Sequence, residues 1–236
     1  MRTSVKIPEP EYIDLAELNP PGRNLREIAY DRMLEMLISG QLAAGTLLQE
    51  RRLAEVLNMS RTPVREVLGM LEAEGLVTRQ HGRLMTVCQI SVQSYIEILN
   101  VRQLLEVEAA GIAAGKIGKA TAEKIRSANW ALMEEASPSP AQHWAVDDLV
   151  HGTIADAADN KLLATLIRDL RRRTHIFNTR RIPSRLRPGC LEHLALIDAI
   201  AAGDAEKSRA LMGEHIENVK GAIVREFVTT VNRRRA

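Results

Sequence analysis

The strongest constraint on the fold is a helix-forming pattern that runs almost without interruption from Ser91 to the C-terminus. It is interrupted only by short clusters of residues that end helices. These clusters are Gly115 and Gly118, residues 137–140, Asp159-Asn160, residues 183–189, and Gly203-Asp204. The interruptions predict about six helices in this part of the chain, packed as an antiparallel bundle.

The composition also favours a mainly α protein. Apolar residues make up 45% of the 236 positions, yet the aromatic residues are only two Phe, two Trp and three Tyr. The core must therefore consist of Leu, Ile, Val, Ala and Met, which favours helices over sheets. Lys and Arg number 32 and Asp and Glu number 30, so any nucleic-acid footprint must be local.

Several classes of protein are excluded at this stage. The two cysteines, Cys88 and Cys190, form neither a disulfide framework nor a cysteine-rich metal cluster. No run of about 18 apolar residues indicates a membrane span, and the N-terminus lacks the apolar stretch of a signal peptide. We therefore expect a cytoplasmic protein with no membrane partner. Residues 1–22 contain four prolines and predict a flexible N-terminal arm.

Residues 23–89 have the pattern of a winged helix-turn-helix domain. An amphipathic segment begins at Asn24 and ends at Ser39-Gly40. Residues 51–57 and 62–74 then form two short helical patterns around a turn at 58–60, which is typical of a helix-turn-helix. Two β-capable runs, 76–80 and 83–88, predict a hairpin, the only convincing sheet in the chain.

Arginines are concentrated around this helix-turn-helix. Arg61 and Arg65 are four residues apart near the N-terminus of the second helix, the end that enters the major groove in such motifs. Arg can bind guanine through two hydrogen bonds. Ser60 is expected to cap this helix and Thr62 to donate to a phosphate. The alternative is that the arginines form a solvated face paired with Glu66.

The stretch ERRLAEVLNMSRTPVREVL at residues 50–68, followed by LEAEGLV at 71–77, closely resembles the winged helix-turn-helix of GntR-family bacterial transcription regulators. The resemblance covers roughly residues 24–88. It implies that Arg51, Arg61 and Arg65 contact the operator, and that the hairpin tip at His81 and Gly82 reaches the adjacent minor groove. A glycine at this tip allows the backbone to approach DNA closely.

Two further pairs of residues suggest a metal site in the helical half. Asp147 and His151 lie four residues apart on one helix, so both project from one face. His193 and His215 lie ten and eleven residues from the Gly203-Asp204 break, or about 15 and 16 Å along their helices. If these helices pack antiparallel, the imidazoles lie at one height, and the four residues could bind Zn²⁺, Ni²⁺, Mn²⁺ or a similar ion.

This half resembles the helical FCD effector domain of the FadR-type branch of the GntR family, over about residues 92–230. The matching pieces are residues 101–106 with 109–110, 147–151, Asn160, 192–193, 203–204 and 212–215. The resemblance implies that Asp147, His151, His193 and His215 are metal ligands. It also implies that Arg102 lines the effector pocket, where it could bind a carboxylate.

Three neighbouring features leave alternatives open. Arg102 could instead form an ion pair with Glu106 on its own helix. His143 could compete as a metal ligand, hydrogen-bond Asp147 or face solvent. Val150 stands where the family usually has Phe, which leaves the pocket size open. An arginine-rich stretch could bind acids of a partner subunit or frame an anionic effector; it comprises Arg168, Arg171, Arg172, Arg173, Arg180, Arg181, Arg185 and Arg187.

These patterns predict an effector-binding and dimerisation domain at residues 90–231 and a basic tail at 232–236. We expect a homodimeric repressor that binds a pseudo-palindromic operator and is released by a small organic acid. Two alternatives remain open at this point. One is a metal-dependent enzyme fused to a DNA-binding module, since an Asp and three His could activate water. The other is a regulator whose metal is purely structural.

Overall fold

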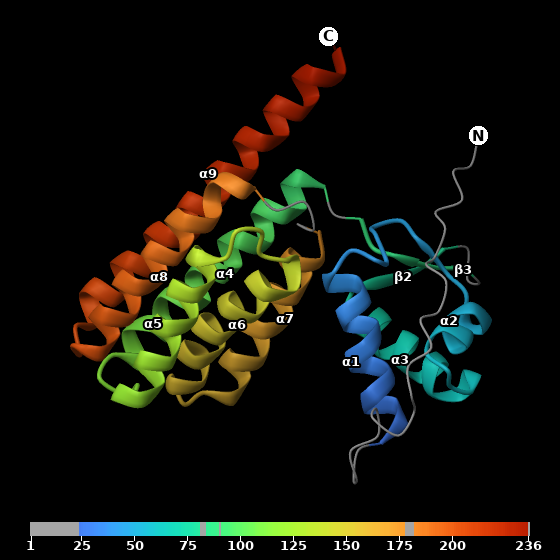
Figure 1. Cartoon of the computed structure of the whole chain (residues 1–236), viewed down its shortest axis with the longest axis horizontal. Helices are drawn as coiled ribbons and strands as arrows, with labels where there is room; N and C mark the ends of the chain where they lie inside the picture. The colour runs from blue at the N-terminus through green and yellow to red at the C-terminus, as the bar shows by residue number, and fades with distance from the viewer. Residues whose placement is uncertain (1–23, 81–83, 90, 178–181, 236) are drawn as a thin grey trace. The chain divides into compact units, whose positions relative to one another are not determined.

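The computed structural model describes residues 24–80, 84–89, 91–177 and 182–235, and the chain divides after Gln89 into two compact units. Within the described residues there are nine α-helices, a single 3-10 turn and one three-stranded sheet (Figure 1). The expected mainly α fold, with a winged helix-turn-helix followed by a helical domain, is confirmed. None of the described helices combines the length and the apolar character that a membrane span requires.

The first unit contains three helices and the sheet. Its elements are α1 (Leu25–Ile38), β1 (Leu47–Leu48), α2 (Glu50–Val56), α3 (Arg61–Ala73), β2 (Val77–Gln80) and β3 (Leu84–Val87). Helix α3 packs against both α1 and α2, and it buries Val64, Val67 and Leu71 completely in the core. A capping box of Asn24 and Glu27 fixes the start of α1.

The sheet has one strand more than the sequence pattern predicts. Its order is β1-β3-β2, and both pairings are antiparallel. The hairpin of β2 and β3 was expected, whereas β1 is only two residues long and therefore shows no alternation of apolar and polar residues. Leu48 of β1 is buried, so this short strand contributes to the core of the first unit.

One local expectation in this unit is wrong. Ser60 occupies the N-cap position of α3, but its side chain makes no capping hydrogen bond. The turn that precedes α3 depends instead on Asn58, whose φ of 51° lies in the left-handed region. The hydroxyl of Ser60 is therefore not committed to the helix end.

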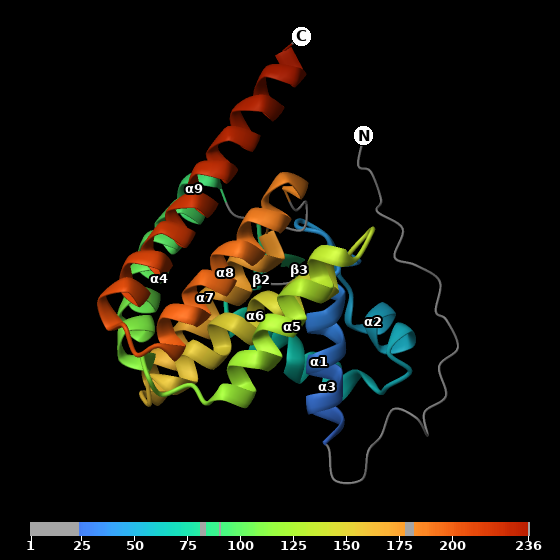
Figure 2. The ribbon, with the colours of Figure 1, turned by 60° about the vertical axis from the view of Figure 1, so that its left-hand side comes forward.

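The second unit is an antiparallel bundle of six helices. They are α4 (Val92–Ala113), α5 (Lys119–Glu134), α6 (Pro140–Ala157), α7 (Lys161–Phe177), α8 (Leu186–Ala201) and α9 (Ala205–Arg235), with the 3-10 turn at Pro183–Arg185. Helix α4 packs along α9, α5 packs against α8, and α8 packs against α9 (Figure 2). Completely buried Leu99, Ile125, Ile167 and Leu196 belong to one continuous core.

The turn between α8 and α9 sets the register of these two helices. Gly203 has a φ of +76°, which an L side chain rarely adopts, and Asp204 accepts a hydrogen bond from the Lys207 backbone at 3.0 Å. A Cβ on Gly203 would lie 3.9 Å from the Cα of Gly115, which also has a positive φ. Two tight turns therefore lie against each other at this end of the bundle.

Helix α6, which carries Asp147 and His151, starts at a capping box. The Ser139 hydroxyl accepts from the Gln142 backbone at 3.1 Å, and the Gln142 side chain accepts from the Ser139 backbone at 2.7 Å. Pro140 occupies the first turn, where it leaves no backbone donor unpaired. This end of α6 is therefore well defined by local interactions alone.

We expect Ser139→Ala to lower the free energy of unfolding by about 1 kcal/mol, because it removes an N-cap acceptor. Ser139→Asp retains an acceptor and should stay close to the parent protein. Urea denaturation followed by circular dichroism measures both variants. Equal loss of stability in the two variants would contradict a role for the cap.

Candidate metal and effector site

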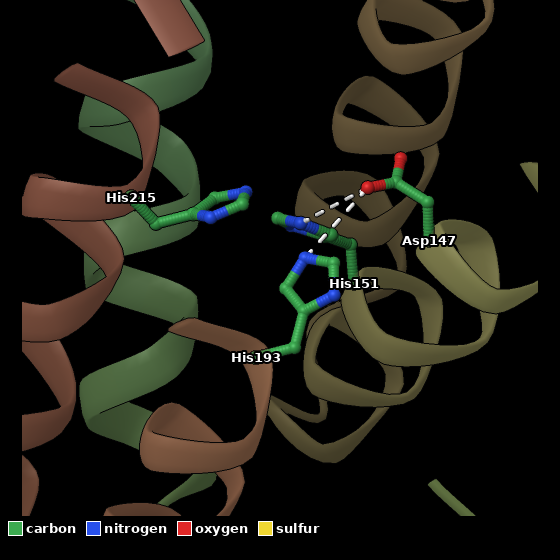
Figure 3. A group of neighbouring side chains, drawn as sticks. All are labelled: Asp147, His151, His193 and His215. Carbon is green, nitrogen blue, oxygen red and sulfur yellow. Dashed lines mark ion pairs between the residues drawn. The ribbon is translucent and has the colours of Figure 1, made fainter. Parts of the chain in front are cut away.

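Four side chains from three helices converge inside the second unit. Asp147 and His151 come from α6, His193 from α8 and His215 from α9 (Figure 3). One potential ligand atom from each residue lies within 4.8 Å of the others. Asp147 Oδ1 is 3.9 Å from His151 Nε2 and 3.7 Å from His193 Nε2. The structure therefore brings together all four residues that the sequence singles out.

The antiparallel packing of α8 and α9 produces the expected alignment of two histidines. The ring centroids of His193 and His215 are 4.7 Å apart. The ring centroid of His151 lies 5.3 Å from that of His193 and 5.2 Å from that of His215. All three imidazoles are buried. Nearly equal distances from the Gly203-Asp204 break thus place two histidines of separate helices side by side.

The Nδ1 atom of each imidazole has a hydrogen-bond partner on the side away from the cluster. His151 bonds to the Glu106 carboxylate, His215 to Glu192 Oε2 at 2.8 Å, and His193 to Asn129 Oδ1 at 3.2 Å. These partner atoms are acceptors, since the Asn129 amide nitrogen itself donates to a backbone carbonyl. The proton therefore lies on Nδ1, which leaves the Nε2 lone pair for a metal.

Two of these Nε2 atoms, on His151 and His193, are buried and have no hydrogen-bond partner among the described residues. A buried acceptor without a partner costs free energy. A metal ion would remove that cost, because neutral imidazole nitrogen and carboxylate oxygen are common ligands of divalent transition metals. The residues present thus fit such an ion.

The electrostatic environment holds these groups in their metal-binding protonation states. Burial lowers the pKa of His151 to about 4, helped by the Arg171 charge. Burial, with the neighbouring imidazoles of His215 and His151, holds the pKa of His193 well below its ordinary value. Burial alone would raise the pKa of Asp147, but Arg171 and the histidines hold it well below its usual range. The carboxylate is charged, and His151 and His193 are neutral, at pH 7.

Arg171 is a site residue that the sequence does not single out from the other arginines. It is 1% exposed, and its Nη2 donates to Asp147 Oδ2 at 2.7 Å. Asp147 therefore presents Oδ1 to the histidines while Oδ2 is bound. Helix α7, which carries Arg171, supplies no predicted ligand, so only the fold could identify this contact.

A cavity of about 120 Å³ adjoins the cluster. Asp147, His193 and His215 line it, and so does Arg102. The ion pair expected as the alternative for Arg102 is present, because Arg102 donates to Glu106 Oε1 at 2.6 Å and to Thr174 Oγ1 at 3.1 Å. Its contact with an effector stays a prediction.

One expectation about the surroundings needs correction. His143 does not hydrogen-bond Asp147; its Nδ1 is buried without a hydrogen-bond partner in the described part of the chain.

Several residues of the arginine-rich stretch pair with acids of the same chain, and Arg171 and Arg185 also line the cavity. The pairs are Arg168 with Asp156, Arg172 with Asp169, and Arg185 with Glu192. Arg180 and Arg181 lie outside the described residues.

The described candidates for DNA contact lie on the first turn of α2 and the N-terminal part of α3. The Arg51 side chain is 82% exposed, and Ser60 and Thr62 are exposed at the start of α3. Arg61 and Arg65 both donate to Glu50, at 3.3 and 2.9 Å. His81 and Gly82 lie outside the described residues.

Glu50 is a neighbour that the sequence analysis did not connect with these arginines. It is the first residue of α2, eleven residues before Arg61. Its carboxylate holds the guanidinium groups of Arg61 and Arg65 together on the exposed face of α3. The hydrogen bond from Arg65 opposes the effect of burial, and the pKa of Glu50 is lowered as a result.

Comparison with known families covers both units. Residues 25–87 match the bacterial regulatory proteins of the gntR family, and residues 97–218 match the FCD domain. The HTH-type transcriptional regulator LutR of Bacillus subtilis (strain 168) is 29% identical over 224 residues, covering 83% of this chain and 100% of that protein. The Uxu operon transcriptional regulator of Escherichia coli (strain K12) is 30% identical over 198 residues, covering 72% and 75%.

A solved structure shares the fold. Escherichia coli McbR/YncC superimposes with a TM-score of 0.75 at 22% identity, over 87% of this chain and 99% of that chain.

We expect Arg171→Leu to lower the free energy of unfolding of the metal-free protein by about 3 kcal/mol, because it leaves the Asp147 carboxylate without its partner inside the bundle. The double variant Arg171→Leu/Asp147→Asn removes the uncompensated charge and should regain much of this loss. Urea denaturation in the presence of a chelator measures both. A double variant no more stable than the single one would show that the pair does not act through its charges.

Proposed function

Because the chain belongs to the GntR family of bacterial transcription regulators and carries an FCD domain, we propose that it is a metal-dependent repressor released from its operator by a small organic acid. The observation that carries this proposal is the convergence of Asp147, His151, His193 and His215 beside a cavity lined by Arg102. The known relatives are transcriptional regulators, and the cluster accordingly serves binding rather than turnover.

Each part of the site has a defined task in this proposal. Asp147 and the three histidines hold a divalent ion of the Zn²⁺, Ni²⁺ or Mn²⁺ type. The bound ion would supply a positive charge and open coordination positions for a carboxylate. Arg102 orients that carboxylate with the N–H groups not engaged by Glu106 and Thr174. Glu106, Asn129 and Glu192 hold the imidazoles in the tautomer that binds a metal.

The acid acts on operator binding through helix α4. This helix begins at Val92, directly after the division between the two units, and it carries both Arg102 and Glu106. An acid that contacts Arg102 better in one arrangement of the dimer than in another shifts the balance between the two. Coupling of this kind is reciprocal, so the operator must also weaken acid binding.

In the first unit, we assign operator contacts to Arg51, Ser60, Arg61, Thr62, Arg65, and the hairpin-tip residues His81 and Gly82. Arg61 and Arg65 lie near the N-terminus of α3 with their guanidinium groups aligned by Glu50. A homodimer presents two such helices to a pseudo-palindromic operator. Because the chain carries a net charge of only +2, affinity depends on placed arginines more than on bulk charge.

His193→Ala should lower the affinity for Zn²⁺ at least about 100-fold, since it removes a ligand outright, and Asn129→Ala should lower it about 10- to 100-fold by releasing the His193 ring. The matched control is His143→Ala, which removes a histidine of the same domain outside the ligand set. Isothermal titration of chelator-treated protein measures all three. Parent-like affinity in His193→Ala would refute the assigned ligand set.

Arg65→Ala should weaken binding to the operator in the protein's own upstream region about 10- to 100-fold, the cost of one base-reading arginine. Arg126→Ala is the control, because Arg126 is also an arginine bonded to a carboxylate, Asp198, and is partly exposed, but lies on α5. Gel-shift titration at fixed salt compares them. If Arg65→Ala binds as tightly as Arg126→Ala, α3 is not the recognition helix.

A further inference from the structure

The cavity beside the ligand cluster is lined by two chemically different groups of residues, which we call its polar side and its apolar side. The polar side includes Asp147, His193, His215, Arg102 and Arg171. The apolar side consists of apolar side chains from three helices. These are Leu132 of α5, Trp144 and Val146 of α6, and Val219, Ala222 and Ile223 of α9. A ligand that fills the cavity must therefore place apolar atoms against α5, α6 and α9 while its charged group meets the metal ligands.

The positive charges around the cavity already have partners. Among the described residues that line it, Arg102 is paired with Glu106 at 2.6 Å, Arg171 with Asp147 at 2.7 Å, and Arg185 with Glu192 at 2.6 Å. A bound divalent ion adds the charge that one carboxylate needs. A second carboxylate on the ligand would find no unmatched described cation in the cavity, and burying it would be costly.

Hydroxyl groups on the ligand would also lack partners on the apolar side. The hydroxyl of Thr174 already donates to the Arg171 carbonyl at 2.9 Å and accepts from Arg102. Apart from the ligand atom His193 Nε2, the buried lining atoms that make no hydrogen bond to a described residue are Nδ1 of His143 and Nε and Nη1 of Arg171. Arg171 is bonded to Asp147, so its two atoms serve an oxygen next to the ligand's carboxylate rather than oxygens along its tail. A chain with a hydroxyl on every carbon would leave several of them unsatisfied.

The volume limits the length of the ligand. The cavity measures about 120 Å³, and a protein cavity of about 150 Å³ holds benzene, which has six non-hydrogen atoms. A carboxylate group accounts for three such atoms, which leaves room for a tail of about two or three carbons. Burying this tail should tighten binding about fourfold per CH₂ group.

We infer that the effector is a short-chain monocarboxylate with an apolar tail, and that α9 contacts this tail through Val219, Ala222 and Ile223. The inference rests on the proposed function, because it takes the metal and Arg102 as the site of the carboxylate. It excludes dicarboxylates and polyhydroxylated sugar acids as preferred ligands. It also assigns the selection between acids to the apolar side of the cavity.

The test is isothermal titration of the Zn²⁺-loaded, full-length protein with four acids: acetate, butanoate, succinate and 2,3,4-trihydroxybutanoate. Butanoate should bind at least about tenfold more tightly than acetate, because two further CH₂ groups are buried. Butanoate should also bind more tightly than succinate and the trihydroxy acid, which have the same number of carbon atoms. Equal or tighter binding of either of these two would overturn the inference while leaving the proposed function intact.

A substitution on α9 tests where the apolar tail of the acid binds. Ala222→Leu fills the cavity beside α9, so it should abolish the preference for butanoate over acetate while acetate binding stays near that of the parent protein. An unchanged preference would overturn the assignment to α9. If Zn²⁺ binds and none of the four acids does, both this inference and the acid-responsive part of the proposed function fail. The acid series on the parent protein decides the ligand class even if Ala222→Leu does not fold.

Discussion

The burial of three imidazoles beside a half-buried carboxylate inside a helical bundle is the constraint on which the second unit depends. A buried polar atom must be paired, or the fold loses stability. Every Nδ1 atom is therefore matched by an acceptor on a neighbouring helix: Glu106 of α4, Asn129 of α5 and Glu192 of α8. The outer pairing is complete, whereas the Nε2 atoms of His151 and His193 have no described partner. The two nitrogen atoms without described partners therefore belong to one cluster, where a metal ion would pair with both.

The same requirement explains why so many arginines of a nearly neutral chain lie in the helical unit. Glu106, Asp147 and Glu192 are themselves buried or half-buried, and each needs a positive partner. Arg102, Arg171 and Arg185 supply them. The hydrogen bonds from His215 and Arg185 overcome the effect of burial and lower the pKa of Glu192 to about 2. Each of these three arginines is therefore paired with one acid. Only its remaining N–H groups are left for a ligand in the cavity.

In the first unit the charges are arranged differently. Arg61 and Arg65 share the carboxylate of Glu50 at an exposed position, where an ion pair contributes little to stability. The pairing instead restricts the rotamers of two long side chains, which lowers the entropy cost of placing them against DNA. An acid in the middle of a candidate DNA-contacting surface is thus compatible with the proposed function, and it explains how a chain with balanced charges can present arginines in a fixed arrangement.

The sequence by itself determined the elements and the candidate ligands. Helix periodicity, the Ser139-Pro140 start and the Gly203-Asp204 break are local signals, so they predicted α6, α8 and α9. The nearly equal spacing of His193 and His215 from one turn predicted that the two lie side by side. Only the tertiary structure decided the partners of those ligands. Asn129 and Arg171 lie 64 and 24 residues from the groups they bond, and no periodicity relates positions on different helices. The short strand β1 and the apolar side of the cavity were also decided by packing, because two residues show no alternation and a cavity exists only between elements.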